Sequence, residues 1–372
     1  MKRSFKNIIW IVARLFFSLF PLDKNKAFFK AYNGLRYTCN PKAISEKLHE
    51  IAPEIKIVWS FNHPEKEKGV PSYVISVKKN SLKEYYHLFT AKFWVMNAGS
   101  MIPQKRKGQL FMDTWHGDRA FKHVAVSTDG SSALAEAYKN VDVLLSGSDY
   151  GDRVIREAMK YKGEILKCGS PRNDLFFNDT KKLALEIKEK LGLNNKAKTL
   201  MFAPTFRGQG DGVEPLHFSK LLDNLEKRDN EPWQCLIRQH YKVPLQKNWT
   251  DDTRIVDVSA YSDMQELLLI SDVVISDYSS LVGDFALLSR SILLYVPDIE
   301  EYKAGKGLYF DLEKSPYQMA TTETELFEKI LSFTLDRASK NCQDILIFYG
   351  NVVENGFASE NAVKWMLERK DG

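Results

Sequence analysis

"DVVISDYSSLVGDFALLSRSILLYV" (272–296) is the stretch of sequence that decides the fold class. Its two ends, 272–276 and 291–296, are short apolar runs of the length that buried strands have, and 280–288 between them is expected to form a helix. A strand, a helix and a second strand in succession predict a βαβ unit with both strands parallel in one sheet. The polar residues "DYSS" (277–280) fall between the first strand and the helix.

The same alternation runs through the remainder of the 372 residues. Strands are also expected at 27–32, 55–61, 73–77, 92–96, 109–115, 142–146, 164–168, 199–204, 234–240 and 254–258. Helices are also expected at 42–51, 82–90, 149–161, 181–191, 217–226, 263–270, 323–335 and 358–367. The turn-rich segment "GSPRNDLFFNDT" (169–180) separates two series of elements. We therefore predict an α/β protein with two Rossmann-like, doubly wound domains that face a cleft, with ligands beyond the carboxyl ends of the strands.

The charge of the chain is concentrated at the N-terminus. The formal net charge is +5, and the first 36 residues contain eight basic groups against Asp23 alone. The basic residues are Lys2, Arg3, Lys6, Arg14, Lys24, Lys26, Lys30 and Arg36. Because a nucleic-acid-binding protein usually spreads its basic residues over a folded face, this local excess argues against a nucleic-acid partner.

The most apolar stretch, "FKNIIWIVARLFFSLF" (5–20), lies within this basic region. It is shorter than the ~20 residues that cross a bilayer, and no small-residue cleavage site of a signal peptide follows it. Its apolar residues share one helical face, which predicts an amphipathic helix over 1–22. Such a helix either packs on the first domain or lies on an anionic membrane surface, with Trp10 and Phe17 near the polar edge. The local basic excess favours the membrane surface.

Residues that hold metals or form disulfides are not grouped in this sequence. The four cysteines, Cys39, Cys168, Cys235 and Cys342, are far apart, which predicts a reducing compartment and neither a disulfide framework nor a zinc site. The motifs GxxxxGK[ST], HExxH and GxSxG are absent, and no GxGxxG stands in the required context. No Asp-x-Asp pair follows a predicted strand, so we predict neither a metal ion bridging a diphosphate nor another cofactor.

Five polar clusters follow predicted strands, and three of them offer one candidate residue each. In "DTWHGDRAFK", His116 could accept a proton from a hydroxyl near neutral pH, or serve as a structural residue of a turn. In "GSPRND", Arg172 could contact phosphate, although a linker turn also explains the segment. In "APTFRG", Arg207 is directed to the same region, and the glycine-rich loop after it does not lead into a helix.

The other two clusters combine cations with hydroxyls. In "IRQH", Arg238 and His240 share one face of a strand and form either a cationic pair for a pyrophosphate or the polar face of an edge strand. In "DYSS", the start of a helix and the hydroxyls of Ser279 and Ser280 could bind an anion. Simple capping, for which Asp277 is suited, requires only one such residue.

Taken together, these clusters resemble the CDP-glycerol glycerophosphotransferase family, which contains teichoic-acid glycerol- and ribitol-phosphate transferases. The matching stretches are "NKAFFKAYNGLRYTCNPKAI", "TWHG", "GSPRND", "APTFR", "RQH", "LLLISDVVISDYSSLVGDFALLSRSILLYVPDIEEY", "GLYFDL" and "NGFASENAV". They run in order from about residue 25 to the end of the chain, and the long block around "DYSS" is the most specific of them.

The resemblance implies a glycosyltransferase-B-like pair of Rossmann domains. An acceptor domain is expected over 23–178 and a CDP-polyol donor domain over 179–372, with the last helix a candidate to return to the first domain. It also implies an enzyme attached peripherally to the cytoplasmic face of a bacterial membrane. The expected reaction moves a polyol phosphate, glycerol phosphate foremost, from a CDP-polyol to a hydroxyl of a lipid-linked glycan, teichoic or capsular acceptor, and releases CMP.

The resemblance also implies roles for particular residues. His116 is the expected base, and His240 is expected to contact the phosphates of the donor, as are the hydroxyls of Ser279 and Ser280. The remaining candidates for the donor site are Arg238, Asp277, Arg207 and Arg172.

Two departures from the family pattern stand out. After "WHG" the family commonly has a small residue and a proline before a lysine, whereas Asp118, Arg119, Ala120 and Phe121 follow here. Gly283 replaces a usual aromatic residue, and a glycine inside a helix indicates close packing or a close ligand. These departures bear on the acceptor or the polyol rather than on the fold.

Two rival functions are compatible with the pattern. One is a nucleotide-sugar-dependent glycosyltransferase of the same architecture, which would release a nucleoside diphosphate instead of CMP. The other is a non-catalytic scaffold at the membrane surface, which would bind no CDP-polyol.

Overall fold

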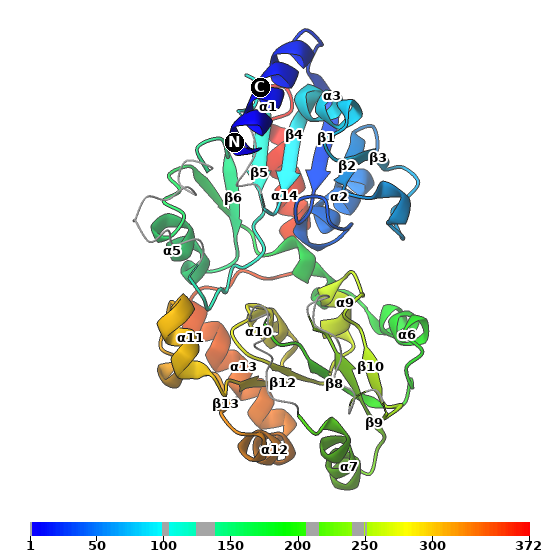
Figure 1. Cartoon of the computed structure of the whole chain (residues 1–372), viewed down its shortest axis with the longest axis vertical. Helices are drawn as coiled ribbons and strands as arrows, with labels where there is room; N and C mark the ends of the chain where they lie inside the picture. Colours follow the sequence, from blue (N-terminus) through cyan, green and yellow to red (C-terminus); the bar gives the residue numbers. More distant parts are fainter. Residues whose placement is uncertain (1, 99–103, 124–137, 206–215, 240–248, 250) are drawn as a thin grey trace. The chain divides into compact units, whose positions relative to one another are not determined.

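The computed structural model describes residues 2–98, 104–123, 138–205, 216–239, 249 and 251–372. By its internal contacts the chain divides into two compact units. Unit 1 comprises Met1–Asp118, Ala125–Phe177 and Val353–Gly372, and unit 2 comprises Arg119–Val124 and Asn178–Val352. The C-terminal segment therefore belongs to the same unit as the N-terminus (Figure 1). The assignment of an acceptor and a donor domain stays a prediction.

Unit 1 is built on a seven-stranded sheet in the order β3-β2-β1-β4-β5-β6-β7, and all neighbouring strands are parallel. The strands are β1 (Asp23–Lys30), β2 (Lys56–Phe61), β3 (Ile75–Lys78), β4 (Ala91–Met96), β5 (Leu110–Asp113), β6 (Val143–Ser146) and β7 (Glu164–Lys167). The strand order reverses between β1 and β4, where Lys30 pairs with Met96. This reversal is the switch point at which open α/β sheets bind ligands.

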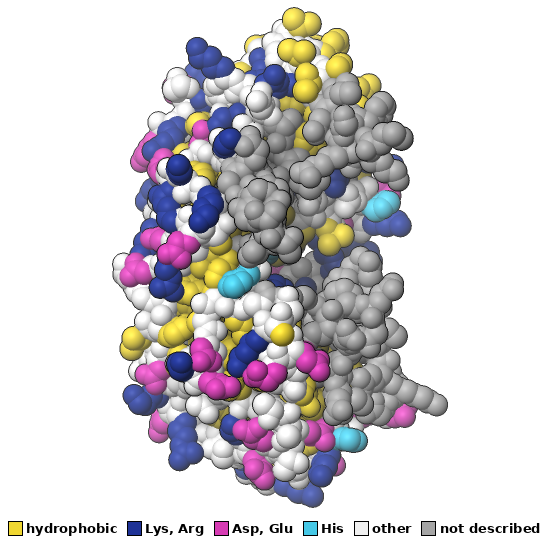
Figure 2. All heavy atoms as spheres, turned by 60° about the vertical axis from the view of Figure 1, so that its left-hand side comes forward, with side chains coloured by type: hydrophobic (Ala, Val, Ile, Leu, Met, Phe, Trp, Pro, Cys, Tyr) yellow, Lys and Arg dark blue, Asp and Glu magenta, His cyan; other side chains and the backbone are white. Residues whose placement is uncertain are grey.

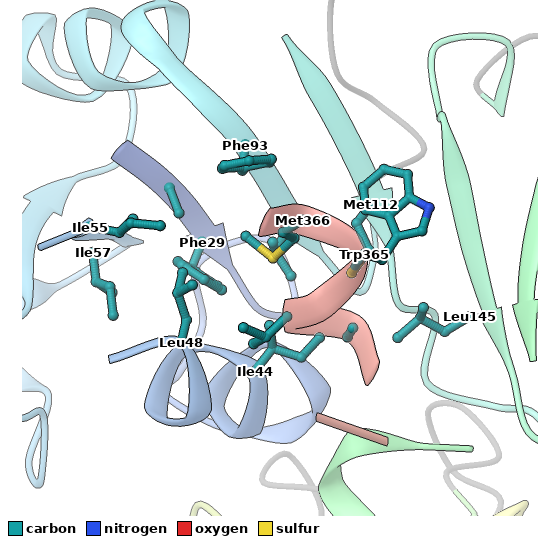
Figure 3. Packing of buried hydrophobic residues seen from close by; sticks show 14 of the residues in the cluster. Phe29, Ile44, Leu48, Ile55, Ile57, Phe93, Met112, Leu145, Trp365 and Met366 are labelled. Atoms are coloured by element: carbon teal, nitrogen blue, oxygen red, sulfur yellow. The ribbon is translucent and has the colours of Figure 1, made fainter. Parts of the chain in front are cut away.

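Helices cover both faces of this sheet. They are α1 (Lys2–Phe17), α2 (Cys39–Ile51), α3 (Leu82–Thr90), α5 (Asp149–Glu157) and α14 (Ala358–Glu368), with the 3-10 turns η1 (Pro64–Lys66) and η2 (Pro171–Phe177). α2 and α14 contact each other, and Leu48 and Met366 on these helices pack against Phe29, Phe93 and Met112 of the sheet (Figure 3). α3 covers the other face, with α1 against it (Figure 1). Burial of each such apolar side chain contributes about 1.5–3 kcal/mol, which holds α14 to unit 1.

Unit 2 repeats this plan with a six-stranded parallel sheet in the order β10-β9-β8-β11-β12-β13. The strands are β8 (Lys198–Phe202), β9 (Trp233–Ile237), β10 (Ile255–Asp257), β11 (Val273–Ser276), β12 (Ser291–Tyr295) and β13 (Met319–Ala320). Its helices are α6 (Lys181–Lys190), α7 (Phe218–Asp229), α9 (Met264–Leu269), α10 (Leu281–Phe285), α11 (Ile299–Lys306), α12 (Glu323–Ser332) and α13 (Leu335–Tyr349), with η3 (Ala286–Leu288) and η4 (Leu312–Lys314). The switch point of unit 2 lies between β8 and β11.

The predicted fold class is confirmed, and each predicted strand is present in the two sheets. Three elements were missed: β13, α11 and α13. The prediction extended one helix over 323–335, but the chain leaves the helical conformation at Phe333. Thr334 then begins a new helix, because its side chain accepts a hydrogen bond from the backbone N–H of Arg337.

The N-terminal helix α1 is docked on unit 1 by its C-terminal end. Phe17 is buried, and its ring meets Tyr86 of α3 edge-on with 5.9 Å between centroids. The guanidinium group of Arg106 donates hydrogen bonds to the carbonyl oxygens of Phe17, Ser18 and Phe20. Phe17 is the last residue of α1, and Ser18 and Phe20 lie just beyond it, so Arg106 fixes the C-terminal end of the helix.

Another side of α1 is apolar and exposed. The large apolar residues on it are Ile9, Ile11, Val12, Leu15 and Phe16, and Leu19 follows just beyond the helix. Leu15 is 60% exposed and Leu19 is 81% exposed. Hydrophobic side chains gather at the top of the view in Figure 2, at the end where α1 lies. Within the described part of the chain, no helix is both long enough and apolar enough to cross a membrane.

Candidate active site

The turn after β5 exposes one side chain, that of His116. From Phe111 to Phe121 every residue is buried except this histidine. Its neighbour Trp115 has a left-handed φ of 46° and donates its backbone N–H to Oδ1 of Asp113 at 2.8 Å. A bulky residue avoids this region of backbone space unless surrounding contacts hold it there. The turn therefore buries the indole ring and leaves the imidazole accessible.

The imidazole of His116 is held in one tautomer. Its Nδ1 lies 2.7 Å from the backbone carbonyl oxygen of Asn97, which directly follows β4. A carbonyl oxygen only accepts hydrogen bonds, so Nδ1 carries the proton and Nε2 carries the lone pair. The ring of Tyr32 meets the imidazole edge-on with 5.2 Å between centroids. The result is a potential base with a defined orientation.

Strained backbone gathers around this histidine. Besides Trp115, both Tyr32 (φ 44°) and Cys39 (φ 66°) lie in the left-handed region. The hydroxyl of Tyr32 donates to Sγ of Cys39 at 3.4 Å, so these residues form one cluster with His116. Each such conformation costs ~1–3 kcal/mol and persists where surrounding contacts hold it, which is typical of functional sites. The strain makes this region a candidate site independently of the sequence motifs.

Arg172, in η2, lies beside the histidine. Its Nη1 donates to the carbonyl oxygen of His116 at 2.9 Å, and its backbone N–H donates to Oδ1 of Asn40 at 3.1 Å. Nδ2 of Asn40 in turn donates to the carbonyl oxygens of Thr114 and Trp115, both at 3.1 Å. The structure thus brings together His116 and Arg172, the two candidate residues that lie in unit 1.

A small polar cavity opens at this turn. Its volume of about 10 Å³ leaves room for about one water molecule. The polar side chains that line it belong to Asn40, Thr114, His116, Asp118, Ser146 and Ser170. A cavity of this size suits a single hydroxyl group and not a whole substrate.

Asp118 links the turn to the segment that follows β6. Its buried carboxylate accepts hydrogen bonds from the backbone N–H of Gly147 at 2.9 Å and from Oγ of Ser148 at 3.0 Å. A Cβ atom at Gly151 would lie 2.0 Å from Oδ1 of Asp118, so only glycine fits there. The sequence analysis connected Asp118 with the acceptor or the polyol. In the structure it ties the His116 turn to the start of α5.

In unit 2, the first half of the "DYSS" segment is used to hold the fold together. Asp277 is buried, and its carboxylate accepts hydrogen bonds from the backbone N–H of Thr205 at 2.9 and 3.0 Å and from Oγ1 of Thr205 at 2.6 Å. The hydroxyl of Tyr278 donates to Asp298 at 3.1 Å, and its ring stacks on Tyr302 with 3.6 Å between centroids. Asp277 therefore joins the loops that follow β11 and β8.

The two serines of "DYSS" differ from the residues before them. Both are half-buried, and Ser280 occupies the N-cap position of α10 without making a side-chain capping bond. Capping by Ser280 therefore does not explain this serine. Within the described part of the chain, the hydroxyl of neither Ser279 nor Ser280 has a hydrogen-bond partner. Both are able to donate to a ligand.

Arg119 and Gly283, the residues at two departures from the family pattern, pack against each other. The side chain of Arg119 is fully buried, and its Nη1 donates to Oδ1 of Asp284 at 2.8 Å. Oδ2 of Asp284 accepts from Nε2 of Gln265 at 3.2 Å. A Cβ atom at Gly283 would lie 2.5 Å from Cδ of Arg119. The guanidinium stem occupies the space that a larger residue would need. Gly283 thus reflects close packing inside unit 2.

The remaining candidates are described only in part. Arg238 follows β9, is half-buried, and donates its backbone N–H to the carbonyl oxygen of Phe202 at 2.9 Å. Arg207 and His240 lie outside the described residues. No group of three or more His, Cys, Asp or Glu side chains in the described ranges is placed to hold a metal ion.

One residue of this site was missed by the sequence analysis. Asn97 directly follows the predicted strand 92–96, in the same way as the five polar clusters follow their strands. Its position after a strand was the available signal, but a lone asparagine carries no motif.

Comparison with known proteins finds relatives that are described as glycerol-phosphate or ribitol-phosphate polymerases or transferases. A model of the family described as CDP-Glycerol:Poly(glycerophosphate) glycerophosphotransferase matches residues 11–368. The teichoic acid poly(glycerol phosphate) polymerase of Bacillus spizizenii is 31% identical over 390 residues, which cover 98% of each chain. The teichoic acid glycerol-phosphate transferase of Staphylococcus aureus is 28% identical over 91% of this chain and 92% of its own. The chain spans only 46% of the polymerase of Bacillus subtilis, to which it is 31% identical over 88% of its own length.

Solved structures agree with these relatives. The wall teichoic acid polymerase TagF has a TM-score of 0.82 at 27% identity, over 100% of this chain and 97% of that one. The UDP-GlcNAc 2-epimerase of Neisseria meningitidis has a TM-score of 0.53 at 12% identity, over 92% of this chain and all of the other, which supports the fold alone. The resemblance drawn from the sequence is confirmed: this chain is an enzyme that belongs to the CDP-glycerol:poly(glycerophosphate) glycerophosphotransferase family.

Proposed function

We propose that the enzyme transfers glycerol phosphate from CDP-glycerol to a hydroxyl group of a teichoic acid acceptor and releases CMP. The observation that carries this proposal is the single exposed imidazole of His116. Its Nδ1 donates to the carbonyl oxygen of Asn97, and the guanidinium group of Arg172 donates to the backbone carbonyl oxygen of His116. A base and a cation side by side suit the attack of a hydroxyl on a phosphate.

In this mechanism Nε2 of His116 takes the proton of the acceptor hydroxyl. The acceptor oxygen forms a bond to the β-phosphorus of CDP-glycerol. The bond from that phosphorus to the bridging oxygen breaks, and CMP leaves with the electron pair. Phosphoryl transfer depends mainly on positioning and on neutralising charge, so no covalent intermediate is required.

The donor phosphates are proposed to bind residues of unit 2, and Arg172 of unit 1 stays a candidate phosphate contact. The hydroxyls of Ser279 and Ser280 supply hydrogen-bond donors, and Arg238, Arg207 and His240 supply positive charge. Asp277 is proposed to act indirectly, by holding Thr205 through three hydrogen bonds. Hydrogen-bond donors and cations placed around the phosphates would stabilise the negative charge of the transition state.

The test is an assay of CMP release from CDP-glycerol with a short synthetic glycerol phosphate oligomer as acceptor. His116→Ala should lower the rate by about 10²–10⁴-fold without changing the melting temperature, because an exposed base contributes to catalysis and little to packing. His217→Ala is the matched control, because His217 is exposed and pairs with Glu323 in unit 2. Near-wild-type CMP release by His116→Ala would contradict the assignment. Release of a nucleoside diphosphate from a nucleotide sugar would favour a glycosyltransferase instead.

We further propose that α1 lies on the anionic cytoplasmic face of the membrane, where a lipid-linked acceptor is available. The exposed apolar side chains of Leu15, Phe16 and Leu19, next to the basic N-terminal residues, support this placement. Replacement of all three by Gln should abolish co-sedimentation with vesicles that contain anionic lipid, while CMP release with a soluble acceptor persists. Leu335→Gln is the control, because this leucine is 82% exposed in unit 2. Unchanged co-sedimentation of the triple variant would refute the proposal.

A further inference from the structure

Asn97 contains a polar group that the fold itself does not use. The residue is 1% exposed, and its Oδ1 accepts a hydrogen bond from the backbone N–H of Tyr32 at 2.7 Å. A backbone N–H only donates, so this bond identifies the oxygen of the amide and fixes Nδ2 on its other side. In the part of the chain that the structure describes, Nδ2 is buried and has no hydrogen-bond partner.

A buried donor without a partner is unusual. More than about nine-tenths of buried polar groups in proteins are hydrogen-bonded, because leaving one without a partner destabilises the fold. An apolar residue at position 97 would avoid this penalty, and a serine would satisfy Tyr32 with a smaller group. An amide at this buried position therefore points to a partner for Nδ2 in another state of the protein, namely when substrate is bound.

The position of Asn97 points to the partner. The residue follows β4 directly and bonds to the segment after β1, so it lies at the switch point of the unit 1 sheet. Ligands of doubly wound sheets bind at that point. The backbone carbonyl oxygen of the same residue holds Nδ1 of His116 at 2.7 Å. The amide nitrogen that lacks a partner in the described chain thus belongs to the residue that orients the proposed base.

We infer that Asn97 is a substrate-binding residue for the phosphoryl acceptor. Its Nδ2 donates a hydrogen bond to an oxygen of the acceptor, close to the hydroxyl group that His116 deprotonates. This inference rests on the proposed function, and it adds an acceptor contact and a link between acceptor binding and the orientation of the base. The ligand group is an alcohol or phosphate oxygen, since only a hydrogen-bond acceptor can satisfy an amide N–H.

Steady-state kinetics of Asn97→Ala and Asn97→Asp test the inference, with CDP-glycerol and a synthetic glycerol phosphate oligomer varied separately. In both variants kcat/KM for the acceptor should fall by about 10–100-fold, as for a lost hydrogen bond to a phosphate or hydroxyl group. KM for CDP-glycerol should stay within about twofold of the wild type, because a contact with the acceptor leaves donor binding intact. In Asn97→Asp the acidic limb of the pH–rate profile should also move to higher pH, because a carboxylate near His116 favours the imidazolium ion.

Asn40→Asp is the matched control. Asn40 is also a buried asparagine at this turn, but its Nδ2 donates to the carbonyl oxygens of Thr114 and Trp115. Its substitution should reduce kcat/KM for both substrates together, whereas Asn97→Asp should reduce kcat/KM for the acceptor and leave KM for CDP-glycerol nearly unchanged. Both variants bury a carboxylate and should lower the melting temperature, so the kinetic split distinguishes them. Asn97→Asp keeps an oxygen for Tyr32, so it remains informative if Asn97→Ala does not fold.

The outcomes separate the inference from the proposed function. If the wild type does not release CMP from CDP-glycerol, the proposed function is wrong. If the wild type is active and both Asn97 variants keep normal acceptor kinetics, only the inference is overturned. A rise in KM for CDP-glycerol instead of the acceptor would also overturn it.

Discussion

The two sheets of this enzyme use the same place in the fold in different ways. At the switch point of unit 1, Asn97 follows β4 and accepts from the backbone N–H of Tyr32, which follows β1. At the switch point of unit 2, Asp277 follows β11 and accepts from the backbone N–H of Thr205, which follows β8. Asp277 uses both carboxylate oxygens on Thr205, whereas Nδ2 of Asn97 has no partner in the described chain. At the switch point of unit 2 the carboxylate is used to hold two loops together. At the switch point of unit 1 one amide N–H remains available to a ligand.

The backbone shows the same contrast. Tyr32, Cys39 and Trp115 around the unit 1 switch point have left-handed φ angles. No residue from Ser276 to Ala286 in unit 2 does. Strain of this kind is retained where a side chain must be held in an otherwise unfavourable direction. The difference fits the proposed roles, in which unit 1 positions a reacting group and unit 2 keeps a phosphate-binding segment in place.

The largest effect on stability is expected from the buried ion pair that holds this segment. Arg119→Met leaves the buried carboxylate of Asp284 without its cation and should lower the free energy of unfolding by about 3–5 kcal/mol, measured by chemical denaturation. Lys303→Met, which removes an exposed pair with Glu300, should leave the midpoint unchanged. If Arg119→Met lowers the free energy of unfolding by less than about 1 kcal/mol, this ion pair does not stabilise the segment.

A smaller loss of stability is expected at the unit 2 switch point itself. Thr205→Val removes the hydroxyl that donates to Asp277 at 2.6 Å and should cost about 1.5–3 kcal/mol, as for a hydrogen bond to a charged group. KM for CDP-glycerol should change by less than about twofold, since the backbone N–H of Thr205 still donates to Asp277 in the variant. Thr321→Val at an exposed position is the control. A large rise in KM for CDP-glycerol without a loss of stability would show that Thr205 acts in substrate binding, as is inferred for Asn97, and not in holding the fold.

The fold could be predicted from the sequence because each buried parallel strand appears as a short, continuous run of apolar residues. The apolar run 291–296 became β12 (Ser291–Tyr295), and the run 142–146 became β6 (Val143–Ser146). β13 (Met319–Ala320) was missed because two residues make no recognisable run. The end of α12 was missed because Thr334 caps a new helix inside one continuous helical pattern.

The candidate site was predictable only where it follows strands. His116 and the two serines of "DYSS" became candidates in this way, and their roles stay proposals. The contacts that hold these segments in place join residues far apart in the chain, such as Tyr32 with Asn97 and Arg119 with Asp284. No spacing or periodicity records such pairs. The left-handed φ of Trp115 could not be predicted from the sequence either, because bulky residues rarely adopt that conformation.

A moderate effect on binding is expected from the two serines. The double variant Ser279→Ala/Ser280→Ala should raise KM for CDP-glycerol about tenfold, the loss of one or two hydrogen bonds to phosphate. The melting temperature should not change, because neither hydroxyl has a partner in the described part of the protein. Ser276→Ala is the matched control: its hydroxyl is buried and donates to the carbonyl oxygen of Ala203 at 2.6 Å, so stability should fall while KM stays constant. An unchanged KM in the double variant would refute the phosphate-binding role.

The smallest effect concerns acid stability and distinguishes the units away from their switch points. His87, on α3 of unit 1, has a buried Nδ1 with no partner in the described chain, and burial lowers its pKa to about 4. An unfolded histidine has a pKa near ~6.5, so between these values the unfolded state binds more protons than the folded state. The stability that His87 contributes is therefore complete above pH ~6.5 and is lost as the pH falls toward 4. His87→Gln should flatten the decline of the melting temperature between pH 7 and pH 4, whereas His217→Gln, at an exposed site in unit 2, should not. Parallel declines in all three proteins would show that carboxylates, rather than this buried histidine, govern the acid sensitivity.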